Sequence, residues 1–180
     1  MITSTPITLR LSISCKHASE AGGHSTALRL PALTYMSLPV YRISLVKDTS
    51  LPYKEACHLL DPAGVADLIR THLKQTDREQ FIVVFLDSAS KVVGLNTVSM
   101  GTLTESLVHP REVFKGAILA NAASMICAHN HPSGEHHPSE ADIAVTAKLK
   151  ESGRILGIPI EDHVIVTDDQ YFSFRSEGLI

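Results

Sequence analysis

With 180 residues, 44% of them hydrophobic, the chain can bury one sizeable core and has little room for a second. A formal net charge of -3 without a long run of Lys and Arg argues against a protein that holds DNA by phosphate neutralisation alone, and three scattered cysteines argue against a disulfide framework or a thiolate zinc site. No apolar run approaches the roughly 20 residues of a membrane span, and the N-terminal sequence does not resemble a secretion signal. We therefore expect a soluble, cytoplasmic protein.

The first 60 residues carry the weakest structural signals. Residues 1–38 have no sustained period of 2 or 3.6, so we expect them to be poorly ordered and the functional chain to begin near Met36. Apolar and polar residues alternate from Tyr41 to Leu45, and residues 39–60 are interpreted as a short strand and a connector. The folded domain is predicted over residues 61–180.

A helix is predicted to start after Asp61, whose side chain can cap it, with Pro62 in the first helical position. The stripe of this helix that is expected to face the core comprises Val65, Leu68, Ile69, His72 and Leu73. The apolar run from Phe81 to Asp87 then predicts a central strand covered on both faces, and residues 92–101 predict its hairpin partner.

Residues 102–108 indicate another short strand, which is followed by a helix that begins at His109 and Pro110 and continues to Ala123. The buried stripe expected for this helix is Val113, Phe114, Ala117 and Ile118. Glu112 falls in its first turn, where a carboxylate complements the positive end of the helix dipole.

The apolar run SMICA predicts a strand that ends near His129, and the turn-rich loop PSGEHHP follows it. A helix with Ser139 as its N-cap and Asp142 in its first turn comes next. Gly157 and Pro159 end that helix, and HVIV and YFSF predict a last pair of strands. The irregular order of helices and hairpins indicates an α/β fold of the α+β kind, with a mixed sheet flanked by helices.

His129 and His131 lie two residues apart, so at the end of a strand both imidazoles leave the same face of the sheet. Asp142 can reach back toward them from the start of the following helix. Two neutral imidazoles and one carboxylate, with a position left for water, form the ligand set of a catalytic zinc site. The alternative is a polar histidine pair in a loop and an aspartate that complements the helix N-terminus.

Four further residues of ligand type are not assigned to the site. His136 and His137 are interpreted as exposed loop residues, because the set of three ligands is already complete. Asp162 and His163 could supply a carboxylate that hydrogen-bonds a metal ligand, or could line the cleft. An aspartate in a turn followed by a histidine in a strand explains them equally well.

The pattern H-x-H-P, followed after six residues by S-x-x-D, resembles the JAMM signature of the MPN+ metal-dependent isopeptidases. Its flanks, SLVHPREVFKGAILANAAS before it and IPIEDHVIV and SEGLI after it, resemble the RadC branch of that superfamily in bacteria. The likeness runs from about residue 61 to residue 180. It implies a JAB/MPN-like fold with a layered architecture like that of cytidine deaminases, and a zinc metallohydrolase of JAMM type.

A zinc ion on the three ligands would supply an activated water for attack on the carbonyl of a peptide or isopeptide-like amide bond. The resemblance assigns the hydrogen bond to the oxyanion to Ser139, whose hydroxyl can accept as a helix cap and donate to the oxyanion at once. Glu79 and Glu112 compete for the role of general base. The JAMM pattern places its glutamate between a leading helix and the first strand, which favours Glu79.

Two functions of different class stay open. One is a zinc-dependent hydrolase that acts on a peptide or protein substrate. The other is a non-catalytic accessory module of DNA repair or recombination on a mobile element, in which the same ligands hold a metal ion that only stabilises the fold. The family's domain is often preceded by a helix-hairpin-helix module, and none fits before residue 61, so direct binding of nucleic acid is not expected.

Overall fold

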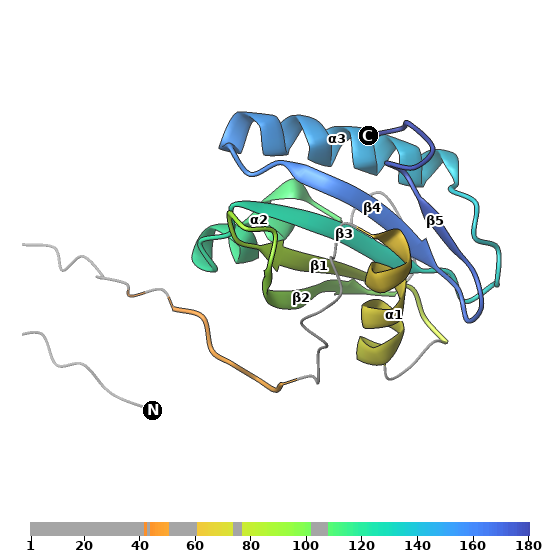
Figure 1. The fold of residues 1–180 in the computed structure, drawn as a ribbon, viewed down its shortest axis with the longest axis horizontal. Coiled ribbons are helices and arrows are strands. Elements are labelled where there is room, and N and C mark those ends of the chain that lie inside the picture. Colours follow the sequence, from red (N-terminus) through yellow and green to blue (C-terminus); the bar gives the residue numbers. More distant parts are fainter. Residues whose placement is uncertain (1–41, 43, 51–60, 74–76, 102–107) are drawn as a thin grey trace, which may run out of the picture. The chain divides into compact units, whose positions relative to one another are not determined.

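The structure, a computed structural model, describes residues 42, 44–50, 61–73, 77–101 and 108–180. Its centre is a five-stranded sheet in the order β2-β1-β3-β4-β5 (Figure 1). The strands are β1 (Gln80–Leu86), β2 (Val92–Met100), β3 (Ser124–Asn130), β4 (Ile160–Val166) and β5 (Tyr171–Ser173). The β3 and β4 strands are parallel and all other neighbours are antiparallel, so the sheet is mixed, as predicted.

Helices cover both faces of this sheet. Within the described ranges they are α1 (Pro62–His72), α2 (Pro110–Leu119) and α3 (Glu140–Leu156). Because side chains alternate along a strand, β1 turns Ile82 and Val84 toward α1, and Phe81 and Val83 toward the face that holds residues of α2 and α3. The predicted α+β fold class is therefore confirmed. None of the helices in these ranges is both long and apolar enough to cross a bilayer.

Most predicted elements form where the sequence places them. Asp61 caps α1 with Pro62 inside its first turn, and every residue of β1 is buried. The hairpin of β1 and β2, the α3 helix with its Ser139 cap, and the pair of β4 and β5 are likewise confirmed. The predicted strand over residues 102–108 lies outside the described residues except for Val108, and residues 1–41 lie outside them altogether.

Two predictions about local structure differ from what the described residues show. Of the strand and connector predicted over residues 39–60, residues 42 and 44–50 have no regular secondary structure and Leu45 and Val46 are exposed, whereas residues 39–41, 43 and 51–60 lie outside the described residues. A strand needs a neighbour to bond with, and the described sheet offers none to this segment. In α2, which ends four residues earlier than expected, Ile118 is 52% exposed and Gly116 is buried instead. The ring of Phe85 packs over Gly116, where an added Cβ would lie 2.7 Å from Phe85 Cζ.

The position of α3 on the sheet matters because this helix carries Asp142, a candidate metal ligand, and Thr146, whose hydroxyl donates to the Asp142 carbonyl. Its C-terminus ends at Gly157, which has the left-handed conformation with φ of 70°. One turn earlier, Gly153 is buried against the chain after the helix, and its carbonyl accepts a hydrogen bond from Ile158 N–H. A Cβ at residue 153 would lie 2.6 Å from the Ile158 carbonyl oxygen, so only glycine permits this approach.

Gly153→Ala is therefore expected to lower the free energy of unfolding by about 1–3 kcal/mol, which is typical of overpacking. In an open helix the same change stabilises by up to about 1 kcal/mol, so the sign is diagnostic. Urea unfolding measures it, with Lys150→Ala at an exposed position of α3 as the control. A variant as stable as the wild type, or more stable, would show that the backbone has room to move.

Candidate metal centre

The end of β3 and the start of α3 bring three ligand-type side chains together. His129 is the next-to-last residue of β3 and is fully buried, whereas His131 follows the strand and its side chain is 11% exposed. Their Nε2 atoms lie 2.9 Å apart. Asp142 Oδ1 lies 3.2 Å from His129 Nε2, and Asp142 Oδ2 lies 3.6 Å from His131 Nε2. The spacing in the sequence thus produces the predicted convergence.

The distances between these ligand atoms suit a metal ion with tetrahedral coordination. Ligand atoms that each lie 2.0–2.1 Å from zinc at tetrahedral angles are about 3.3 Å apart from one another, and the three observed distances bracket that value. The donor set of two imidazoles and one carboxylate also suits zinc and leaves one position open for water. His129, His131 and Asp142 therefore fit a metal ion of this kind.

The loop between β3 and α3 orients His131. His131 N–H donates to the Val166 carbonyl at 3.0 Å, which joins the start of the loop to the end of β4. Nδ1 of the His131 ring lies 2.6 Å from the backbone carbonyl of Glu135. A carbonyl only accepts, so Nδ1 carries the proton, and in the neutral ring Nε2 is left unprotonated toward Asp142.

The charges of the three residues respond to their closeness. Burial opposes ionisation of Asp142, but the adjacent imidazoles of His129 and His131, which attract the carboxylate when they carry a second proton, outweigh it and hold the pKa of the carboxyl well below its usual range. The Asp142 carboxylate stabilises the protonated ring of His131 and so raises the pKa of His131, whereas burial lowers the pKa of His129. An ionised carboxylate facing two imidazoles is a site that attracts a cation.

Ser139 lies beside this cluster and is tied to Asp142 by a capping box. Its Oγ accepts from Asp142 N–H at 3.2 Å, and its N–H donates to Asp142 Oδ2 at 2.8 Å. Its hydroxyl proton also goes to Asp142 Oδ2, at 2.6 Å. The proton that we expected Ser139 to offer an oxyanion is thus engaged by a carboxylate here, and donation to a substrate requires the hydroxyl to rotate.

A cavity of about 360 Å³ is lined by two of the three ligands, His131 and Asp142, and Glu79 is part of its wall. The lining residues are Glu79, His131, Ser133, Glu135, His137, Pro138, Ser139 and Asp142. Glu79 immediately precedes β1, as the sequence predicted, and is half-buried. Both proposed catalytic residues, Glu79 and Ser139, therefore share one cavity with two of the ligands.

Asn130 fixes the backbone on either side of Glu79, a role that the sequence analysis missed. Its Oδ1 accepts from Gln80 N–H at 2.8 Å, and its Nδ2 donates to the Arg78 carbonyl at 3.0 Å. The carbonyl of Glu79 itself accepts from Gly101 N–H at 2.9 Å. The residue between the two histidines thus joins the start of β1 to the end of β3.

The competing glutamate is engaged elsewhere. Glu112 lies in the first turn of α2, where its carboxylate forms ion pairs with Lys115 and Arg111. The hydrogen bond from Lys115 is the main cause that lowers the pKa of Glu112. Glu112 is not among the residues that line the cavity, so the geometry favours Glu79.

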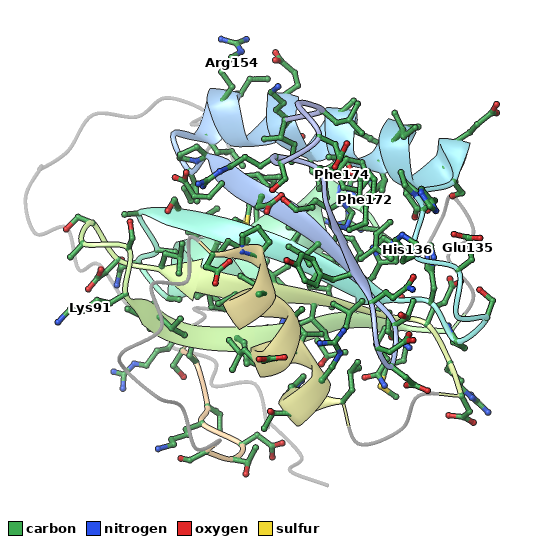
Figure 2. All side chains as sticks on the ribbon, turned by 45° about the vertical axis from the view of Figure 1, so that its right-hand side comes forward. Lys91, Glu135, His136, Arg154, Phe172 and Phe174 are labelled. Atoms are coloured by element: carbon green, nitrogen blue, oxygen red, sulfur yellow. The ribbon has the colours of Figure 1, made fainter. Side chains whose placement is uncertain are left out.

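The remaining histidines differ in their surroundings. Figure 2 shows Glu135 and His136 on the loop before α3, where His137 Nδ1 lies 2.8 Å from Glu135 Oε1. Glu135, His136 and His137 could also gather around an ion, but Glu135 and His137 are exposed and His136 is only half-buried. His163, in contrast, is fully buried, and its Nε2 lies 2.8 Å from His129 Nδ1.

Asp162 points away from the ligands. Its carboxylate accepts hydrogen bonds from the Ser173 hydroxyl, Arg175 N–H and His163 N–H, so it holds together β4, β5 and the turn after β5. Burial is the main cause that raises the pKa of Asp162. Of the pair that we left unassigned, only His163 contacts a candidate ligand.

Comparison with known proteins agrees with this arrangement. The family described as a RadC-like JAB domain matches residues 59–179. A protein of Rubrobacter xylanophilus named UPF0758 protein is 45% identical over 139 residues, which cover 77% of this chain and 59% of that protein. The UPF0758 protein of Desulforamulus reducens is 47% identical over 119 residues, or 66% of this chain and 52% of that protein. The chain spans about half the length of these curated relatives.

Proposed function

The chain belongs to the family of RadC-like JAB domains, and from that premise we propose that it is a zinc-dependent hydrolase of peptide or isopeptide-like amide bonds. One observation carries the proposal: His129, His131 and Asp142 converge as an open ligand set, and two of them, His131 and Asp142, line a cavity that Glu79 and Ser139 also line. The proposed substrate is a peptide or protein, and the proposed location is the cytoplasm.

Each residue has a defined task in this reaction. A bound zinc ion supplies a Lewis acid and a water whose pKa is lowered to near neutrality. The Glu79 carboxylate takes a proton from the attacking water and passes it to the leaving nitrogen. The Ser139 hydroxyl turns from Asp142 Oδ2 to the substrate oxygen as negative charge develops there.

The second candidate is a module that holds the metal ion without catalysis. It is favoured by the hydrogen bond from the Ser139 hydroxyl to Asp142 Oδ2, because that bond engages the proton that an oxyanion donor needs. In this case the ion stabilises the junction of β3 and α3, and the cavity serves a partner rather than a scissile bond.

A cleavage assay separates the two candidates. The full chain is loaded with zinc and incubated with an unbiased library of peptides and isopeptide-linked peptides, and mass spectrometry identifies new termini. If the chain is a zinc-dependent hydrolase, cleavage should disappear when zinc is removed by a chelator and return when zinc is added back. Cleavage that survives chelation contradicts the metal-dependent mechanism, and a zinc-loaded chain that cleaves nothing favours the non-catalytic module.

A further inference from the structure

Behind the candidate ligands, a buried row of hydrogen bonds joins His129 to the backbone of Asp142. His129 Nδ1 lies 2.8 Å from His163 Nε2, and His163 Nδ1 lies 2.6 Å from Thr146 Oγ1. The Thr146 hydroxyl donates to the Asp142 carbonyl at 2.5 Å. All four residues are at most 3% exposed. The row therefore connects the ligand on β3 to the ligand on α3 out of contact with solvent.

His163 is neutral in these surroundings. Its ring stacks on the ring of Phe174, with centroids 4.8 Å apart, and meets the ring of Phe81 edge to face, with centroids 5.4 Å apart. The neighbouring carboxylate of Asp162 is bonded to Ser173 and to backbone N–H groups. A fully buried imidazole packed on aromatic rings strongly disfavours the charged form.

The direction of every hydrogen bond in the row follows from its last acceptor. A backbone carbonyl only accepts, so the Thr146 proton points to Asp142 and Thr146 Oγ1 must accept from His163 Nδ1–H. The Nε2 atom of neutral His163 is then unprotonated, and it accepts from His129 Nδ1–H. His129 is left with an unprotonated Nε2, the atom that faces Asp142 Oδ1.

We propose that His163 and Thr146 are positioning residues that hold His129 in the Nδ1–H tautomer, with the Nε2 lone pair turned to the metal position. Ligating histidines usually donate their second N–H to a carboxylate, a carbonyl or water. His131 follows that rule through Glu135, whereas His129 reaches a carbonyl only through two further side chains. The inference rests on the proposed metal centre and does not require hydrolysis.

The matched substitutions Thr146→Val and Thr146→Ser test this role. Val keeps the shape of Thr but removes the acceptor of His163 Nδ1–H, so His163 can move its proton to Nε2 and leave His129 protonated on Nε2. We expect the dissociation constant for zinc, measured by competition with a chromophoric chelator, to rise about 10- to 100-fold. Ser keeps the hydroxyl, so zinc binding should stay within about threefold of the wild type.

A second measurement reads the tautomer directly. The ¹⁵N shifts of the His129 ring in the zinc-free protein should report Nδ1–H in the wild type and Thr146→Ser, and Nε2–H in Thr146→Val. A role confined to packing would change the free energy of unfolding of the zinc-free protein without changing this tautomer. Circular dichroism confirms that each variant is folded.

Three results would overturn the inference. The first is that His129 carries its proton on Nε2 in the wild type. The second is that Thr146→Val is folded and binds zinc as tightly as the wild type. The third is that Thr146→Ser binds zinc as weakly as Thr146→Val. A chain that binds zinc but cleaves no amide contradicts the proposed hydrolase alone. A chain that binds no zinc contradicts the metal centre, and the ¹⁵N shifts still decide whether the row of hydrogen bonds fixes His129.

Discussion

Replacing Glu79 by Gln is expected to reduce turnover by about 10²- to 10⁴-fold while the zinc content and the fold stay unchanged. Glu79 lines the cavity with His131, Ser139 and Asp142, but it is not one of the three converging ligands. An amide keeps the shape of the side chain and cannot take a proton from water. The measurement is kcat on the substrate found by library cleavage, with metal content determined on the same sample.

Glu112→Gln is the matched control, because Glu112 is the other glutamate that the sequence offers as a general base. Its carboxylate pairs with Lys115 and Arg111 at the N-terminus of α2, so its loss should leave kcat within about twofold and cost only the small stability of exposed ion pairs. The assignment is wrong if Glu112→Gln abolishes activity and Glu79→Gln does not. If neither variant changes turnover, neither Glu79 nor Glu112 is the general base.

His131→Ala is expected to reduce the zinc content from about one ion per chain to nearly none, because two protein ligands cannot replace a set of three. The side chain is 11% exposed and lies at the end of β3, so its removal leaves the core of the sheet intact. Zinc should also raise the unfolding temperature of the wild type, since a ligand that binds only the folded state stabilises it, and should not raise that of the variant.

His137→Ala controls for the exposed histidines of the same loop. His137 belongs to the second group, with Glu135 and His136, that could hold an ion. Elemental analysis of both variants, after removal of any affinity tag, should show zinc lost in His131→Ala and retained in His137→Ala. The reverse pattern would place the tightly bound ion on the loop, and equal zinc content in folded samples of both would contradict the ligand assignment.

The elements that the sequence predicts well are those whose signals are local. Asp61 with Pro62, and Ser139 with Asp142, mark helix starts by side chains that bond their own backbone, and both helices begin there. His129 and His131 share a face because of the strand period alone. The prediction that Ile118 belongs to the buried face of α2 is wrong, because Phe85, on a strand distant in the sequence, packs over Gly116 and so decides which side of α2 is covered.

The parts of the site that the sequence did not predict depend on register between distant segments. His163 reaches His129 across the parallel pair β3 and β4, in which Cys127 faces His163 and His129 faces Ile165. Asn130 reaches across to β1, where its amide holds the backbone around Glu79. Strand register of this kind cannot be read from either segment alone. The one available signal was the run of three polar residues, Glu161 to His163, in a strand that is otherwise apolar.

Anomalous X-ray diffraction from crystals of the zinc-loaded full chain, recorded on either side of the zinc absorption edge, tests the central claim most directly. The proposed centre predicts one strong peak within bonding distance of His129 Nε2, His131 Nε2 and an Asp142 carboxylate oxygen, and no such peak in His131→Ala. A zinc-loaded crystal without a peak between these three residues, or with its only peak at Glu135, His136 and His137, would contradict it.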